Sequence, residues 1–294
     1  MGRTPNDVMQ HALSLLWQSI FTWASWVIVL VMLVIAVWMG IKQRTPFYLI
    51  ACLAAGVSAF AEPLYDVAFD LWFYDAHADG APGAGFTHFS AFMVPQPNWT
   101  HSGYMILYAT ACLYAGRLIY QGRFSRRALF AVWGAEIILS CVFEVTGTAT
   151  NVYTYYGPYV GRVWNYPFII GVLEGTQVIL FTVVAVLVWR KVATNWGLLG
   201  LFIVFPMTFF GANFGLGAPV IIALHLDHGL ATRTVIGLAT IVSIVLCAVV
   251  VNGLSKFLPD TPPVESSDAE HRAGGFGEQQ PQPVLGQSDA VEQR

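Results

Sequence analysis

The chain has 294 residues, of which 56% are hydrophobic and only 11% are charged, and its formal net charge is −3. A soluble domain carries roughly 25% charged residues, so this composition excludes an ordinary soluble protein and indicates an integral membrane protein. The basic residues fall in short loops rather than in a stripe or patch, which excludes nucleic-acid binding. We therefore expect a multi-pass protein of the cell membrane.

Seven apolar segments are each long enough for the roughly 20 residues that a spanning helix needs. The predicted fold class is all-α, with seven transmembrane helices between residues 19 and 258 and a short polar lead over residues 1–18. The predicted helices cover residues 19–41, 46–70, 101–121, 128–148, 166–189, 196–225 and 233–257.

The basic residues are distributed unevenly between the two sets of loops. Only Arg162 and Arg233 lie in the loops of one set. Because cytoplasmic loops are enriched in Lys and Arg, we expect the N-terminus outside and the C-terminus in the cytoplasm. The loops predicted to be cytoplasmic hold Lys42, Arg44, Arg117, Arg123, Arg126, Arg127, Arg190 and Lys191.

Two long segments lie outside the predicted helices. Residues 71–100 lie on the predicted outer side and, at about 30 residues, exceed an ordinary connection, which favours a lid or a re-entrant segment. A disordered outer loop is the alternative, and the many aromatic residues argue against it. Residues 259–294 are rich in Pro, Gln, Gly, Ser and Glu and are predicted to form a disordered cytoplasmic tail.

Three acidic residues end the second predicted helix. Glu62, Asp66 and Asp70 have the spacing i, i+4 and i+8, which places them on one helix face. A charge near the centre of a bilayer costs about 2.5–3.5 kcal/mol, so such an acid usually has a partner or a function. A carboxyl kept partly protonated near neutral pH can act as a general acid.

Further polar residues occur at similar depth in other predicted helices. At 1.5 Å per residue, Glu144, Glu174 and Asn213 reach about the level of Glu62, whereas Asp70 lies about 6 Å above Asp66 and either caps the site or is solvated. We predict one polar pocket that opens outward beneath residues 71–100. The alternative is a set of separate hydrogen bonds between helices, each worth about 0.6 kcal/mol.

Aromatic residues surround this predicted pocket. Tyr104, Tyr153, Tyr156 and Trp99 are candidates for binding an oxygenated substrate. The alternative is an aromatic belt at the membrane interface. In residues 196–225, Gly211-xxx-Gly215 favours close helix packing, and a helix break lining the pocket is the alternative.

Several functional classes find no support. The chain has no phosphate-binding glycine loop, no HExxH and no GxSxG motif. The three lysines lie at predicted cytoplasmic ends, which excludes a retinal Schiff base. His225-Leu-Asp227-His228 lacks a clear third protein ligand, and the four cysteines have no CxxC spacing. We expect no cofactor and no metal.

The order and spacing of several motifs over about residues 60–222 resemble the AveC-like spirocyclase family of actinobacterial membrane proteins. The resemblance is carried by Glu62-Pro63-xx-Asp66, Trp72-Phe73-Tyr74, Pro97-x-Trp99, Gly103-Tyr104, Arg117, Glu144, Tyr153-xx-Tyr156-Gly157, Pro167, Pro206-Met207, Gly211 and Pro219. The namesake of this family closes a dihydroxy-ketone into a spiroketal during avermectin formation, and some members also dehydrate it. The resemblance therefore implies a cyclase of secondary metabolism acting on a polyketide-like or lipid-like substrate.

The acidic residues suit such chemistry. Our hypothesis assigns Glu62 as general acid, Asp66 as its partner base or cation stabiliser, and Glu144 as a second acid or base. Glu174, Asn213 and the aromatic residues would orient the substrate, with Asp70 at the mouth. Two alternatives stay open: a transporter or lipid-binding protein with an acid-lined, outward-facing pocket, and an isomerase or hydratase of a terpenoid or sterol-like lipid.

Overall fold

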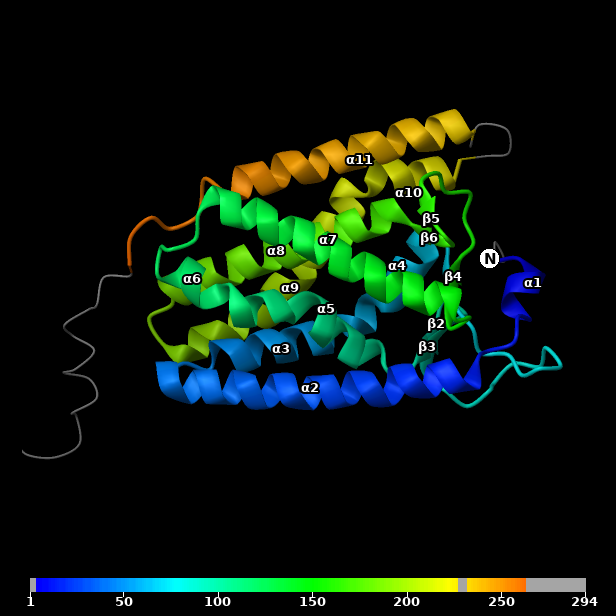
Figure 1. Cartoon of the computed structure of the whole chain (residues 1–294), viewed down its shortest axis with the longest axis horizontal. Helices are drawn as coiled ribbons and strands as arrows, with labels where there is room; N and C mark the ends of the chain where they lie inside the picture. The colour runs from blue at the N-terminus through cyan, green and yellow to red at the C-terminus, as the bar shows by residue number, and fades with distance from the viewer. Residues whose placement is uncertain (1–3, 227–231, 263–294) are drawn as a thin grey trace, which may run out of the picture. The chain divides into compact units, whose positions relative to one another are not determined.

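The computed structural model describes residues 4–226 and 232–262, which form one helical unit (Figure 1). Helices account for 69% of the residues, which confirms the all-α class. Most of the predicted tail, residues 263–294, lies outside the described residues. The helices are α1 (Asn6–Met9), α2 (Leu15–Gln43), α3 (Phe47–Ser58), η1 (Ala59–Ala61), α4 (Glu62–Phe69), α5 (Thr100–Tyr114), α6 (Gly116–Tyr120), α7 (Arg126–Ala149), α8 (Phe168–Lys191), η2 (Asn195–Gly200), α9 (Leu201–Phe209), η3 (Phe210–Leu216), α10 (Ala218–Leu224) and α11 (Arg233–Leu254).

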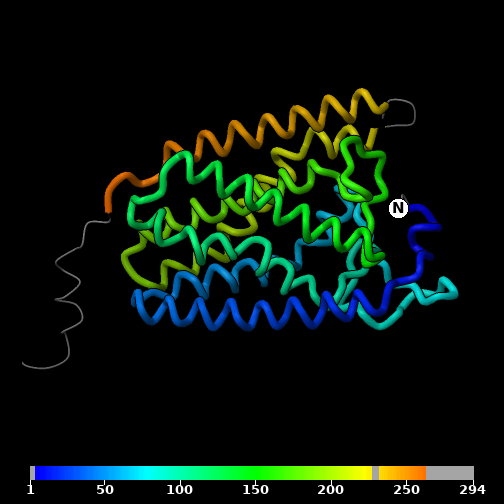
Figure 2. The backbone as a smooth tube through the Cα atoms, viewed as in Figure 1, coloured from blue at the N-terminus to red at the C-terminus, as the bar shows by residue number. Residues whose placement is uncertain are grey.

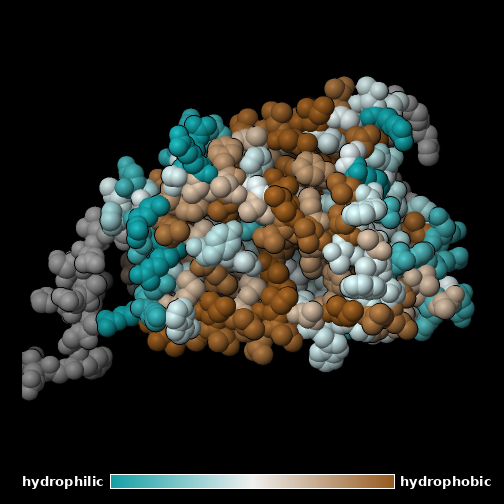
Figure 3. All heavy atoms as spheres, viewed as in Figure 1, coloured by the Kyte–Doolittle hydropathy of each residue, from teal (hydrophilic) through white to brown (hydrophobic). Residues whose placement is uncertain are grey.

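Within the described ranges, six helical stretches are long and apolar enough to cross a membrane, so the chain is a polytopic membrane protein. Figure 3 shows the matching surface, apolar over the middle of the bundle and hydrophilic towards both ends. The six stretches are Leu15–Gln43, Phe47–Phe69, Arg126–Ala149, Phe168–Lys191, Asn195–Leu216 and Arg233–Leu254.

The predicted helix over residues 101–121 is not continuous. It forms the 15-residue α5 and the five-residue α6, which meet at Ala115. Gly116 begins α6 against the Phe47 ring, and a Cβ at Gly116 would lie 3.3 Å from that ring. A small residue at this point therefore leaves room for the Phe47 ring beside the start of α6.

Helix α8 is the centre of the bundle. In its most apolar stretch 89% of the residues are buried, compared with 22% in both α7 and α11. Helices α5, α7, α9 and α11 pack around α8, and Figure 2 traces the backbone of these helices along the bundle. A polar side chain on α8 is consequently buried in protein rather than exposed to lipid.

Side-chain caps define two helix starts. Ser125 Oγ accepts a hydrogen bond of 3.2 Å from the Ala128 amide at the start of α7. Thr232 Oγ1 accepts one of 3.3 Å from the Val235 amide at the start of α11. Each cap satisfies an amide that has no partner within its helix.

Within residues 4–226 and 232–262, three short antiparallel sheets lie at the end of the bundle where residues 71–100 fold. The segment is ordered: β1 (Leu71–Phe73) pairs with β4 (Tyr153–Tyr155), and β2 (Thr87–Ala91) forms a hairpin with β3 (Val94–Pro97). The third sheet joins β5 (Arg162–Val163) to β6 (Tyr166–Pro167). The β1–β4 pair connects the end of α4 to the segment after α7, and this connection positions the site described below.

The glycine pair in the sixth predicted helix lies in η3, a π-helical stretch. Both Gly211 and Gly215 are exposed, and no atom lies within 4 Å of a Cβ built at Gly211. Neither glycine therefore packs closely against another helix in the described part of the chain, and the prediction of close helix packing at this motif is wrong. The interruption of the helix is real, because η3 separates α9 from α10.

Candidate active site

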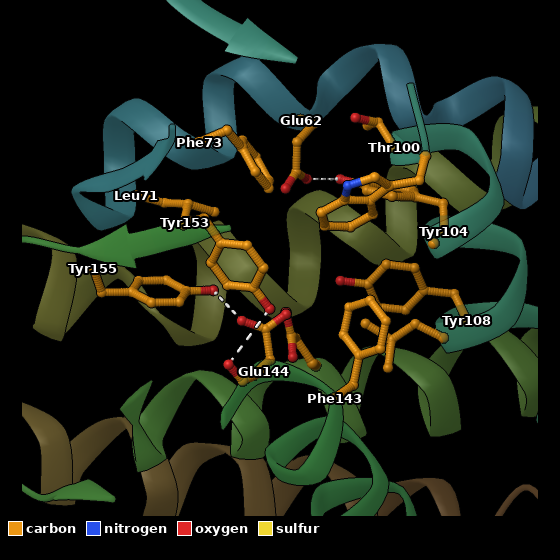
Figure 4. A pocket seen from close by; sticks show the side chains of 14 residues that line it. Glu62, Leu71, Phe73, Thr100, Tyr104, Tyr108, Phe143, Glu144, Tyr153 and Tyr155 are labelled. Atoms are coloured by element: carbon orange, nitrogen blue, oxygen red, sulfur yellow. Dashed lines mark hydrogen bonds between the residues drawn. The ribbon is translucent and has the colours of Figure 1, made fainter. Parts of the chain in front are cut away.

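A small buried chamber lies beneath the β1–β4 sheet, between α4, α5, α7 and α8. Figure 4 shows Glu62 and Glu144 on opposite sides of it, with Tyr104 and Tyr108 from α5 pointing in between them. Its free volume of about 30 Å³ suffices for one or two water molecules. The lining residues are Glu62, Leu71, Phe73, Trp99, Thr100, Gly103, Tyr104, Leu107, Tyr108, Phe143, Glu144, Tyr153, Tyr155 and Glu174.

Glu62 begins α4 and enters the chamber from the side of the second spanning helix. Its side chain is only 9% exposed, and the Tyr104 hydroxyl donates a hydrogen bond of 2.5 Å to Glu62 Oε2. Glu62 is preceded by the 3-10 turn η1, which joins α3 to α4. The Glu62 carboxyl therefore meets the chamber with one oxygen held by a phenol.

Glu144 enters from α7 and is held by the sheet above it. The Tyr155 hydroxyl donates a hydrogen bond of 2.9 Å to Glu144 Oε2, and the Tyr153 hydroxyl approaches the Glu144 carbonyl oxygen at 3.5 Å. Both tyrosines point to the same face of β4 because side chains alternate along a strand. They are paired in register with Leu71 and Phe73, so these four side chains roof the chamber.

Tyr153 and Tyr155, the two tyrosines of the roof, are suited to donate hydrogen bonds as neutral phenols. Burial, with a further contribution from the Glu144 carboxyl, raises the pKa of both Tyr153 and Tyr155 well above the usual value of 10.0. Both phenols therefore keep their protons throughout the physiological pH range. Arg162 stabilises the backbone of this roof, because its Nη2 donates a hydrogen bond of 3.0 Å to the Tyr155 carbonyl oxygen.

Glu174 reaches the chamber from the central helix α8. It is 3% exposed, and the Tyr65 hydroxyl donates to its Oε1 at 3.3 Å. Ser140 on α7 donates to Oε2, and the Tyr166 hydroxyl lies 3.5 Å from the same oxygen. Three carboxyls from three helices thus converge, each bound by at least one hydroxyl group.

The chamber lacks a compensating positive charge. No Lys, Arg or His side chain is among its lining residues in the described part of the chain. Buried acids without basic partners avoid the cost of isolated charge by sharing protons and hydrogen bonds with neighbouring groups. Such a set can both give and accept protons at neighbouring points of one bound molecule.

Asp66 lies in a different cavity from Glu62. It is fully buried, accepts a hydrogen bond of 2.5 Å from Gln96 Nε2 and interacts with the Glu62 carboxyl. Its Oδ1 has no hydrogen-bond partner among the described residues. An outer pocket of about 370 Å³ is lined by Thr4, Met9, Asp66, Val67, Asp70, Trp72, Phe92, Met93, Val94, Tyr156 and His225. The single pocket predicted from the sequence is therefore two cavities.

Asp70 and Tyr156 belong to this outer pocket. Asp70 ends α4 in the left-handed conformation, with φ 52°, and is 1% exposed rather than solvated. His225 Nε2 lies 3.8 Å from Asp70 Oδ1. The Tyr156 amide donates to the Asp70 carbonyl at 2.8 Å, and its hydroxyl lies 3.2 Å from Thr4 Oγ1.

The two remaining predicted site residues, Trp99 and Asn213, lie in different parts of the fold. Trp99 lines the chamber, and its Nε1 donates to Gln18 Oε1 at 3.1 Å. Asn213 is fully buried in η3, where its amide donates to the Phe209 carbonyl at 3.1 Å, and it is not among the chamber's lining residues. The depth estimate for Asn213 carries no information about the direction in which its side chain points.

The structure also identifies site residues that the sequence hypothesis did not assign. Tyr65 and Tyr166 bind Glu174, and Gln96 binds Asp66. The helical spacing of Tyr65 from Glu62, i to i+3, was the one available signal. Gln96 offered none, because its contact depends on how the hairpin docks.

The described residues contain no cluster of three or more His, Cys, Asp or Glu side chains arranged to hold a metal ion. Asp227 and His228 of the His225-Leu-Asp227-His228 stretch lie outside the described residues. Comparison of the chain with family models, with curated proteins and with solved structures finds no match.

Proposed function

We propose that this protein is a membrane-embedded acid/base cyclase of the spirocyclase type, which closes or dehydrates a hydroxylated ketone. The observation that carries the proposal is the convergence of Glu62, Glu144 and Glu174 on one chamber that excludes basic side chains. The motif resemblance to AveC-like spirocyclases supports the same chemistry.

Ketal closure needs proton transfers in both directions. One substrate hydroxyl adds to the ketone carbon, its proton passes to a base, and the ketone oxygen takes up a proton to give a hemiketal. A second protonation releases that oxygen as water, and the other hydroxyl attacks the resulting cation and loses its proton. The net change is the loss of one water molecule, and no external oxidant or reductant takes part.

The contacts suggest a role for each carboxyl. Glu62 is proposed as the general acid at the ketone oxygen, and Glu144 on the opposite side as the base for the attacking hydroxyl. Tyr104 and Glu174 would orient the substrate oxygens. Asp66 lines the outer pocket, so we assign it the return of protons to Glu62 rather than contact with substrate.

We also propose seven membrane crossings, with the N-terminus outside and the C-terminus in the cytoplasm of a cell-membrane protein. Helices α5 and α6 together cover residues 100–120, and about 20 residues suffice to cross a bilayer. The positive-inside rule supports the orientation.

A second candidate is a non-enzymatic transporter or lipid-binding protein. The outer pocket favours it, because a cavity of about 370 Å³ with Asp66 and Asp70 in its wall has room for a small ligand. Binding without conversion would support this candidate over the cyclase.

The test uses the full chain in lipid nanodiscs and a long-chain dihydroxy-ketone with heavy oxygen in its carbonyl group. Cyclisation gives a product lighter by one water that has lost the label, whereas dehydration of a hydroxyl keeps the label. Protein-dependent loss of the label supports the cyclase. Binding of the probe without any change in its mass would reject it.

A further inference from the structure

An apolar slot opens beside the chamber, between α5 and α7. Its free volume is about 380 Å³, more than ten times that of the chamber. Helix α7 packs on α8 rather than on α5, which leaves the slot between the two helices. The slot is lined by Phe21, Gly103, Ile106, Leu107, Thr110, Glu136, Leu139, Val142, Phe143 and Thr146.

The slot follows one face of each helix. Its α5 residues begin at Gly103 and recur at i+3, i+4 and i+7, and its α7 residues extend from Glu136 to Thr146. At 1.5 Å per residue, these ten steps along α7 correspond to about 15 Å. The slot is therefore elongated along the membrane-crossing direction, as an extended chain requires.

The walls present hydrocarbon to an occupant. Thr110 Oγ1 donates to the Ile106 carbonyl at 2.5 Å, and Thr146 Oγ1 donates to the Val142 carbonyl at 2.7 Å, so both hydroxyls are satisfied within their own helices. Glu136 is 2% exposed and accepts a hydrogen bond from the Tyr114 hydroxyl. This bond links α7 to α5 at the inner end of the slot.

The outer end of the slot adjoins the chamber. Gly103, Leu107 and Phe143 line both cavities. The Phe143 ring packs against Phe21 and Trp99, with centroid distances of 5.3 and 5.9 Å. Leu107 and Phe143 thus form a side-chain partition between an apolar slot and an acidic chamber.

The side of the slot faces the bilayer. Leu139 and Val142 are 55% and 62% exposed, although both lie on a helix that crosses the membrane. Their exposed surfaces contact lipid chains, so an apolar molecule can pass from the bilayer into the slot without crossing water.

We propose that this slot binds the hydrocarbon chain of an amphipathic substrate, which enters sideways from the membrane and presents its oxygenated end to the chamber past Leu107 and Phe143. The proposal rests on the cyclase function and names its substrate class as a hydroxylated ketone on a long apolar chain.

The test is photolabelling in nanodiscs, independent of turnover. The probe is a long-chain dihydroxy-ketone with a diazirine in its alkyl chain, and labelled peptides are identified by mass spectrometry. We expect saturable labelling of α5 and α7 residues that line the slot, with competition by the unlabelled long-chain compound and none by a short-chain homologue.

Neighbouring substitutions provide the control. Leu139→Trp fills the slot and should reduce saturable labelling about tenfold, a loss of ~1.4 kcal/mol of binding free energy. Ile138→Trp, at a position 65% exposed that does not line the slot, should leave labelling unchanged.

Three outcomes would contradict binding of the substrate chain in the slot: labelling that does not saturate, labelling spread equally over other lipid-facing helices, or no labelling above background. Saturable labelling of the slot without any product would support chain binding in the slot and would contradict the proposed cyclase function. Failure of the slot and failure of the proposed function are therefore distinguishable.

Discussion

Glu62 and Asp66 lie one turn apart on α4, and their carboxyls interact, yet they line different cavities. Glu62 faces the closed chamber, whereas Asp66 faces the outer pocket. The pair therefore lies between the acidic chamber and a cavity near the end of the bundle. This arrangement suits passage of protons between the two cavities.

Tyr155→Phe should slow the reaction more than it destabilises the fold. Loss of the bond to Glu144 should cost about 1–2 kcal/mol, close to tenfold in kcat if the bond positions the base. The control is Tyr159→Phe, which removes a hydroxyl that donates to the Phe69 carbonyl at 2.6 Å. Equal kcat values for the two variants would contradict a specific role for Tyr155.

Gly147→Ala should displace Tyr153 from the roof. A Cβ at Gly147 would lie 2.2 Å from that ring, so we expect destabilisation by about 1–3 kcal/mol. Gly134→Ala, on the same helix with no atom within 4 Å, should instead stabilise by about 0.5–1 kcal/mol. Thermal unfolding in detergent distinguishes them, and similar melting temperatures would argue against the observed packing.

Gln96 and Asp66 should be energetically coupled. Gln96→Leu leaves the Asp66 carboxyl without its amide donor, at a cost of about 1–3 kcal/mol. A double-mutant cycle with Asp66→Asn should give a coupling energy of about 0.5–3 kcal/mol. Additive effects in the cycle would mean that the hairpin does not hold Asp66.

The orientation can be tested with introduced cysteines. Asp79 and Arg123 are exposed in loops at opposite ends of the bundle, and the native cysteines are buried or partly buried. In intact cells, a membrane-impermeant maleimide should label Asp79→Cys and should reach Arg123→Cys only after permeabilisation. The reverse pattern would invert the topology.

Much of the fold was predictable from the sequence, because apolar segments of spanning length are a strong signal. The break at Ala115 was not predictable, since its residue composition continues the helical pattern. Depth along the helices predicted that Glu62, Glu144 and Glu174 share one level, and the structure brings these three residues to one chamber. Rotation about each helix axis decides which way a side chain points. Sequence distance alone could not separate Asp66 from the chamber or exclude Asn213 from its lining.

Pairing between strands far apart in the sequence is a second feature that the sequence could not predict, and the β1–β4 pair is an example. The length of residues 71–100 predicted a lid or a re-entrant segment, but the partner of β1 lies about 80 residues away in β4. Non-local pairing of such short strands leaves little trace in local patterns. Consequently, the contact of Tyr155 with Glu144 required the structure.

The chamber carboxyls are proposed to perform acid/base chemistry, and a comparison of carboxyl with amide side chains tests this role most directly. Turnover of the dihydroxy-ketone should be measured for Glu62→Gln, Glu144→Gln and the exposed control Asp79→Asn, after unfolding has shown that each variant is folded. We expect kcat to fall by about a hundredfold or more in both chamber variants and to stay unchanged in Asp79→Asn. Wild-type kcat in a folded Glu62→Gln protein would contradict the account.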